Sequence, residues 1–75
     1  MKKIKKIKIK INGKFSMINE NLSLSAFLKQ LEIPLKKVAI ELNQEIIDKN
    51  IINKIKLIEN DKIEIVHFIG GGWIW

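Results

Sequence analysis

Several residue types are absent or scarce in this chain of 75 residues. It has no cysteine and no arginine, and it has a single proline and a single histidine. Without cysteine there are no disulfides, no thiolate metal ligands and no cysteine nucleophile. No apolar run reaches the roughly 20 residues of a membrane-spanning helix, and the lysine-rich start lacks the apolar segment of a signal peptide. We therefore expect one cytoplasmic domain that has no contact with membranes.

The charge of the chain is strongly basic, with a formal net charge of +6. All 14 basic residues are lysine, so the bidentate contacts that arginine makes to phosphates and guanine edges are excluded. The abundance of isoleucine, lysine and asparagine is typical of AT-rich coding, which raises lysine whatever the protein does. We expect no nucleic-acid partner, and we interpret the N-terminal lysines as the solvated face of a strand.

The N-terminal part predicts a β-hairpin. Residues 7–11 alternate between isoleucine and lysine, which is the period-two pattern of a half-buried strand. Asn12-Gly13 follows, and this pair favours a type I′ turn because both residues tolerate positive φ. Residues 14–18 then form the returning strand.

One amphipathic helix is expected after the hairpin. Ser23 is placed to cap it, and Leu22 and Phe27 have the spacing of a hydrophobic staple. Its apolar stripe falls at helical spacing and consists of Leu24, Phe27, Leu28 and Leu31. Pro34 is expected to end the helix, since proline disfavours helical backbone in the residue before it.

The second half of the chain predicts three further strands, at 38–42, 45–47 and 62–68, with Asn43-Gln44 as a turn. Residues 50–57 are ambiguous between a helical turn and an irregular segment with buried isoleucines. The order strand, strand, helix, strand, short strand, strand indicates an α+β fold, in which one main helix packs on one face of a mixed sheet of four to five strands.

No pattern in the sequence predicts catalysis. Glu41 and Glu64 could be paired carboxylates, but no nucleophile or base accompanies them, and we interpret both as exposed strand residues. His67 is expected to be a partly buried residue at a strand end rather than a metal ligand. The chain has no phosphate-binding loop, metal motif or catalytic triad. We predict that it is not an enzyme and holds no metal.

Three stretches carry a resemblance to a known family: Ile11-Asn12-Gly13-Lys14, Val38 to Asn43, and Asn60 to Gly72 with its closing Gly70-Gly71-Gly72. They resemble the ubiquitin-like (β-grasp) sulfur carriers of thiamine biosynthesis. The resemblance implies a β-grasp domain over 1–69 and a flexible glycine tail over 70–75 that includes Trp73-Ile74-Trp75.

The resemblance also implies a function. A partner adenylyltransferase uses ATP to activate the terminal glycine carboxylate, a persulfide sulfur donor such as a cysteine desulfurase converts it to a thiocarboxylate, and thiazole synthase receives the sulfur. Gly72 is then the sulfur acceptor, and Gly70 and Gly71 give the slim tail clearance. The chain itself needs no cofactor. Val66 and Phe68, just before the tail, are a predicted docking patch for the activating enzyme, unless residues 50–57 cover them.

The sequence departs from this family after its glycines, because Trp73 follows Gly72 and Gly72 has no free carboxylate. Either the tail is cut after Gly72, or the chain has lost sulfur carriage and binds through its Trp-Ile-Trp segment. Gln44 stands where the family has glycine, and Asn43 can supply a left-handed residue instead. Two alternatives stay open: the small subunit of molybdopterin synthase, and a ubiquitin-like binding module without sulfur chemistry.

Overall fold

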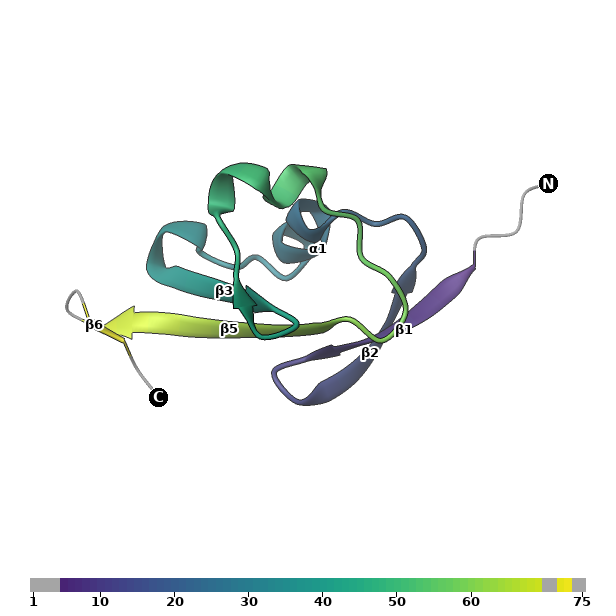
Figure 1. Ribbon diagram of the computed structural model, residues 1–75, viewed down its shortest axis with the longest axis horizontal. Coiled ribbons are helices and arrows are strands. Elements are labelled where there is room, and N and C mark those ends of the chain that lie inside the picture. Colours follow the sequence, from purple (N-terminus) through teal and green to yellow (C-terminus); the bar gives the residue numbers. More distant parts are fainter. Residues whose placement is uncertain (1–4, 70–71, 74–75) are drawn as a thin grey trace.

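The structure, a computed structural model, describes residues 5–69 and 72–73. A mixed sheet forms one layer, and a helix with a 3₁₀ segment forms a second layer on one of its faces (Figure 1). The strands run in the order β2-β1-β5-β3-β4. Their bounds are β1 (Lys6–Ile11), β2 (Lys14–Asn19), β3 (Val38–Leu42), β4 (Glu45–Ile46) and β5 (Lys62–Ile69), and β6 (Gly72–Trp73) pairs with β5. The predicted α+β, β-grasp architecture is confirmed.

The middle strand of the sheet is β5, although it is the last long strand in the chain. It runs parallel to β1, with Ile11 opposite Ile63, and antiparallel to β3, with Ile40 opposite Ile65. The predicted N-terminal hairpin joins β1 to β2 through Asn12 (φ 48°) and Gly13 (φ 84°). Both turn residues have the left-handed backbone that a type I′ turn requires.

The helix α1 (Leu24–Gln30) begins as the sequence predicts. The Ser23 hydroxyl accepts a hydrogen bond from the Ala26 N–H at 3.0 Å, a cap that stabilises a helix by about 1 kcal/mol. Leu24, Phe27 and Leu28 are buried, but Leu31 follows the last turn and is 45% exposed. The predicted stripe is therefore correct for three of its four residues.

The end of α1 differs from the prediction. The helix stops several residues before Pro34, because Glu32 takes a left-handed backbone with φ 56°. The Ile33 N–H donates to the Leu28 carbonyl at 3.1 Å and the Glu32 N–H donates to the Lys29 carbonyl at 3.0 Å. These two bonds make a Schellman motif, which is commonly built on glycine. A short 3₁₀ segment, η1 (Leu35–Lys37), then leads into β3.

The second tight turn corrects the expectation for Gln44. Asn43 does not replace it as the left-handed residue, because both residues are left-handed, with φ 52° and 73°. Glutamine thus occupies a backbone region that costs a non-glycine residue roughly 1–2 kcal/mol. The hairpin that this turn joins pairs Leu42 with Glu45 and Glu41 with Ile46.

The ambiguous segment forms a 3₁₀ helix, η2 (Lys49–Lys54), followed by an irregular stretch. It packs against α1, and hydrogen bonds from Leu24 N–H to the Ile55 carbonyl and from Leu57 N–H to the Leu22 carbonyl hold it there. Ile52 and Leu57 are buried, whereas Ile51 and Ile58 are exposed. Residues 50–57 therefore belong to the helical layer.

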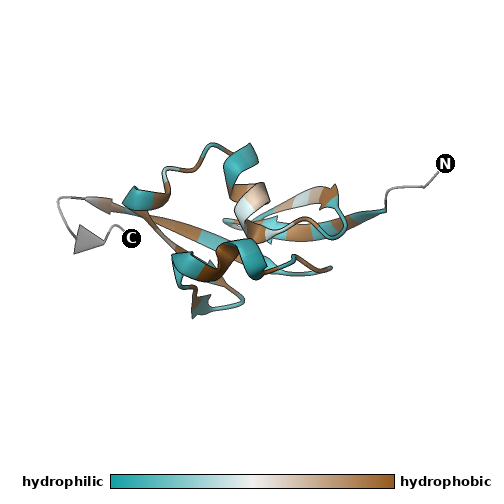
Figure 2. Ribbon diagram, turned by 90° about the horizontal axis from the view of Figure 1, so that it is seen from above, coloured by the Kyte–Doolittle hydropathy of each residue, from teal (hydrophilic) through white to brown (hydrophobic). Residues whose placement is uncertain are grey.

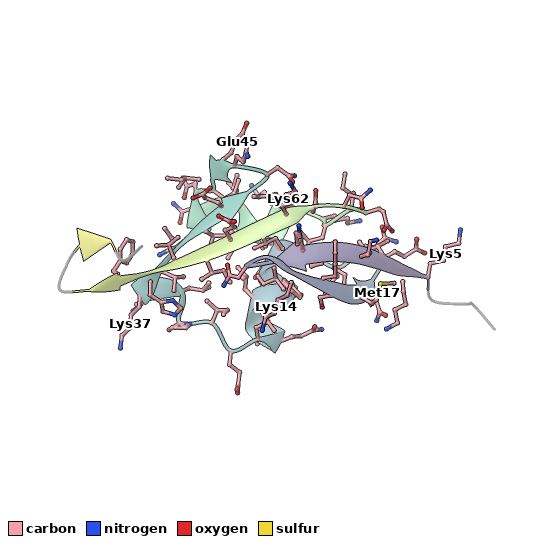
Figure 3. All side chains as sticks on the ribbon, turned by 90° about the horizontal axis from the view of Figure 1, so that it is seen from below. Lys5, Lys14, Met17, Lys37, Glu45 and Lys62 are labelled. Atoms are coloured by element: carbon pink, nitrogen blue, oxygen red, sulfur yellow. The ribbon has the colours of Figure 1, made fainter. Side chains whose placement is uncertain are left out.

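The core lies between the two layers. Apolar and polar residues are interspersed along the strands (Figure 2), and the buried apolar side chains of the sheet pack against α1 and η2. The largest fully buried side chains are Ile9, Leu24, Leu28, Ile40, Leu57, Ile63 and Val38. The other face of the sheet has no helix over it in the described part of the chain (Figure 3). Among the described residues, no helix is long and apolar enough to cross a membrane.

Candidate functional site

The candidate site is the end of β5 that leads into the glycine run. β5 continues past its last pair with β1 at Ile63 and past its last pair with β3 at His67 (Figure 1). Gly70 and Gly71, the predicted clearance residues, lie outside the described residues, as do Ile74 and Trp75. The predicted division into a domain over 1–69 and a flexible tail over 70–75 stays a prediction.

Gly72, the predicted sulfur acceptor, is in β6. Its backbone pairs with Ile69 and that of Trp73 pairs with Phe68, in an antiparallel register. In the uncut chain, Gly72 is thus an internal strand residue beside β5.

Two asparagine side chains hold β5 in place. The Asn12 Oδ1 accepts from the Ile65 N–H at 2.8 Å, and so continues the β1–β5 ladder after β1 has ended. The Asn43 Oδ1 accepts from the Lys62 N–H at 2.9 Å. Sequence reasoning assigned both asparagines to turns and missed these bonds. Their only signal was that asparagine stands first in each turn pair, and asparagine can both adopt positive φ and bond to backbone groups.

Asp61, directly before β5, is a buried polar residue. It is 6% exposed. Its Oδ1 accepts from the Asn43 Nδ2 at 2.9 Å, and its Oδ2 accepts from the Ile58 N–H at 2.9 Å. Because both carboxylate oxygens are bonded, burial of the charge is compensated. Asp61 fixes the loop that precedes β5.

Val66 and Phe68, the predicted docking residues, lie on the face of β5 that alternation turns away from the core. Both are half-buried. Val66 pairs with Ala39, and the Lys49 Nζ lies 5.7 Å from the Phe68 ring centroid. The alternative expectation was that residues 50–57 cover Val66 and Phe68. Because residues 50–57 pack on α1, they lie mainly over the other face of the sheet.

The remaining candidate residues show no catalytic arrangement. His67 is exposed, so the expectation of partial burial is wrong; it stands at the last pair of the β3–β5 ladder, opposite Val38. Glu41 and Glu64 are directly opposite each other across the same ladder, Glu41 half-buried and Glu64 exposed. Exposure was therefore predicted correctly only for Glu64. Within residues 5–69 and 72–73, no group of three or more His, Cys, Asp or Glu side chains could hold a metal ion.

Comparison with known families shows to which family the chain belongs. The ThiS family matches residues 4–72, nearly the whole chain. The chain belongs to the ThiS family. The matched region ends at Gly72, the acceptor that the family resemblance implies. The resemblance to the ubiquitin-like sulfur carriers of thiamine biosynthesis is thereby confirmed.

Individual relatives agree with the ThiS assignment. The sulfur carrier protein ThiS of Bacillus subtilis is 35% identical over 65 residues, which cover 85% of this chain and 98% of that protein. A thiazole synthase of Paramagnetospirillum magneticum is 38% identical over 66 residues, 88% of this chain. The chain spans only 20% of that relative's length, and the same share of a thiazole synthase of Magnetococcus marinus.

A solved ThiS structure has the same fold. The crystal structure of the thiamine biosynthesis protein ThiS from Geobacter metallireducens superposes with a TM-score of 0.79 at 28% identity. The match covers 88% of this chain and 100% of that one. Sheet, helix and the position of the last long strand therefore follow the ThiS pattern.

Proposed function

We propose that the chain carries sulfur as a thiocarboxylate on Gly72, after hydrolysis of the bond between Gly72 and Trp73, and that it delivers this sulfur to thiazole formation. The observation that carries the proposal is the ThiS match, which ends at Gly72, three residues after the middle strand of the sheet ends at Ile69. The two thiazole synthases that contain a segment similar to this chain support thiazole synthase as the acceptor of the sulfur. The molybdopterin alternative has no comparable support.

The chemistry requires partner enzymes and a free carboxylate. Water cleaves the Gly72–Trp73 amide, and the new carboxylate attacks the α-phosphorus of ATP on an adenylyltransferase, with release of pyrophosphate. A persulfide sulfur of a donor protein attacks the acyl adenylate and AMP leaves. A thiol then reduces the acyl disulfide and leaves the thiocarboxylate. The chain acts as a co-substrate, because activation, sulfur supply and ATP all come from its partners.

The β6 strand supports the requirement for trimming. In the uncut chain, Gly72 and Trp73 pair with Ile69 and Phe68 along the last residues of β5. Removal of Trp73 takes away one of these two pairs, so only the pair of Gly72 with Ile69 is left to hold the new terminus on β5. A glycine tail without side chains can then enter a narrow active-site channel.

Val66 and Phe68 are the proposed docking residues for the activating enzyme. They lie on β5 directly before the glycine run, so an enzyme that binds them has the acceptor carbon a few residues away. Half-buried apolar groups next to a reactive terminus fit a transient interface, which buries less apolar area than an obligate one.

Intact-mass measurement tests the proposal. The chain ending at Gly72 is incubated with ATP, a thiamine-type adenylyltransferase, a cysteine desulfurase and cysteine. The expected result is a mass gain equal to the exchange of one oxygen for sulfur, and the same reaction on the chain that retains residues 73–75 gives no gain.

The Bacillus subtilis ThiS protein serves as the positive control for enzyme competence. If the enzymes modify that protein but leave the chain ending at Gly72 unchanged, sulfur carriage is refuted. If they modify the uncut chain, the requirement for trimming is refuted. Gly72→Ala in the trimmed chain is expected to slow modification, because a methyl group is added next to the reacting carbonyl.

A further inference from the structure

A second surface lies on the uncovered face of the sheet, at the end opposite the glycine run. Phe15 and Met17 of β2 project there and are 67% and 58% exposed, although the neighbouring Ile18 is buried. Phe15 is directly opposite Lys10, and Met17 is directly opposite Lys8 (Figure 3 labels Met17). We call Lys8, Lys10, Phe15, Met17 and Lys62 the basic-aromatic surface.

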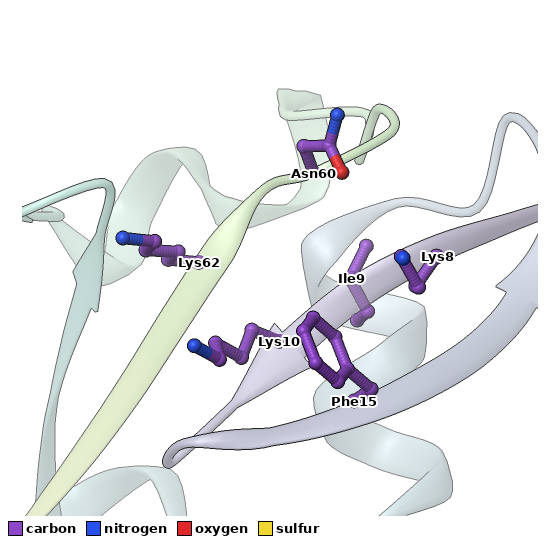
Figure 4. Close-up of a pocket in the computed structure, with 6 residues that line it drawn as sticks. All are labelled: Lys8, Ile9, Lys10, Phe15, Asn60 and Lys62. Carbon is purple, nitrogen blue, oxygen red and sulfur yellow. The ribbon is translucent and has the colours of Figure 1, made fainter.

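Two lysines of this surface, Lys8 and Lys10, lie against one ring. The Lys8 Nζ lies 4.8 Å and the Lys10 Nζ 5.1 Å from the centroid of Phe15. Each contact is worth about 0.5–1 kcal/mol at an exposed site, and the ring thereby holds two like charges near each other. With Lys62, these residues border a hollow of about 280 Å³ whose other lining residues are Ile9 and Asn60 (Figure 4).

Acidic groups lie beside this surface rather than within it. The Glu59 carboxylate, at the rim, accepts from the backbone N–H of Lys8 at 3.1 Å. Glu41 and Glu64 border a second hollow together with Gln44 and Lys62, so Lys62 lines both hollows. On the uncovered face, the lysines thus gather over β1 and the start of β5, and the carboxylates of Glu41 and Glu64 follow on β3 and β5.

This arrangement favours a protein partner over a nucleic acid. A phosphate backbone that crossed the sheet would meet the carboxylates of Glu41 and Glu64 directly after the lysines, and like charges repel. The surface also offers a flexible thioether, Met17, beside an aromatic ring, and methionine adapts to irregular apolar side chains of a protein partner. Carboxylates of a partner would form ion pairs with the lysines, and an apolar side chain of the partner would cover Phe15 and Met17.

We propose that the basic-aromatic surface is a docking site for an acidic segment of a partner protein, with its carboxylates on Lys8, Lys10 and Lys62 and an apolar side chain on Phe15 and Met17. The site is independent of the proposed sulfur transfer. Lys62 begins β5 and Ile69 ends it, so roughly 23 Å of strand separates the surface from the glycine run. A partner bound here leaves Val66, Phe68 and Gly72 accessible.

An NMR titration of the full ¹⁵N-labelled chain tests the proposal with a defined probe, the peptide Glu-Glu-Leu-Phe-Glu-Glu. Its binding is expected to shift the amide resonances of β1 and β2, and to weaken as salt is added. The peptide Gln-Gln-Leu-Phe-Gln-Gln has the same apolar centre but no charged side chains. The shifts that it causes in the β1 and β2 resonances are expected to be at least fivefold smaller. Oligothymidylate tests the nucleic-acid alternative.

Paired variants locate the site. We expect the affinity for the acidic peptide to fall about fivefold in the double variant Lys8→Gln with Lys10→Gln, and about fivefold in the single variant Phe15→Ala. The matched control is Lys36→Gln with Lys37→Gln, which removes the same charge at two exposed lysines of η1 and is expected to change affinity less than twofold. Equal loss in both lysine pairs would mean a nonspecific charge effect and would overturn the proposal. So would tighter binding of oligothymidylate than of the peptide, or shifts confined to other elements.

Discussion

The two tight turns of the sheet, Asn12-Gly13 and Asn43-Gln44, have the same backbone and different chemistry. Both place two consecutive residues in the left-handed region, and both use an asparagine first. In each turn the asparagine Oδ1 accepts a hydrogen bond from a backbone N–H of β5. The Ile65 N–H donates to Asn12 and the Lys62 N–H donates to Asn43. The middle strand is thus fixed from both neighbouring hairpins by side chains, in addition to its ladders.

The turns differ in what else they hold. Asn43 also donates from Nδ2 to the buried Asp61 carboxylate, whereas the Asn12 side chain, among the described residues, bonds only through its Oδ1. The second position is glycine in the first turn and glutamine in the second. The second turn therefore makes more tertiary hydrogen bonds than the first. Its backbone is also the more strained, because a glutamine rather than a glycine has positive φ there.

The largest expected effect separates the two asparagines. Asn→Gly keeps the left-handed turn and removes only the side chain. Asn43→Gly should lower the free energy of unfolding by about 2–3 kcal/mol, because the buried carboxylate loses a charge-assisted bond, and Asn12→Gly by about 1 kcal/mol. Urea unfolding of both variants measures the difference. Equal losses would contradict the greater structural weight assigned to Asn43.

The next effect has the opposite sign. Gln44→Gly should raise the free energy of unfolding by about 1 kcal/mol, because glycine adopts φ 73° without the steric cost that a Cβ brings. Thermal unfolding should show a rise of roughly 4–8 °C for a domain of this size. Gln44→Ala is the control, since alanine retains the Cβ. A gain of the same size in the alanine variant would show that strain is not the cause.

The smallest effect concerns the acidic pair beside the second turn. Glu41→Gln should raise the free energy of unfolding by about 0.5 kcal/mol, because Glu41 and Glu64 are like charges directly opposite each other. The gain should shrink as salt is added. Glu20→Gln makes the same charge change at an exposed residue outside this pair. If both variants behave alike, the cross-strand repulsion is not significant.

Much of this fold could be predicted from local pattern. The isoleucine–lysine alternation, the Asn12-Gly13 turn and the Ser23 cap depend on residues adjacent in sequence, and all three predictions are confirmed. The glycine run could also be recognised directly, and the family match extends to Gly72.

The features that the sequence missed depend on distant residues. The bond from the Ile65 N–H to Asn12 spans 53 positions, and that from Asn43 to Asp61 spans 18. No local pattern reports such bonds. The helix end was misplaced because a Schellman motif on Glu32 lacks the usual glycine signal. His67 continues the alternation of β5 to the end of the β3 ladder, where the pattern no longer reports burial.

The unequal lengths of the sheet strands give the molecule a built-in spacer. β5 runs from its last pair with β1 at Ile63 to Ile69, roughly 20 Å at the rise of an extended strand, and from its last pair with β3 at His67 roughly 7 Å. An enzyme that grips the far end of β5 can therefore stand clear of the N-terminal hairpin. This distance is set by strand length, so shortening β5 by two residues would bring Ile69 about 7 Å nearer to the hairpin without altering any group that reacts.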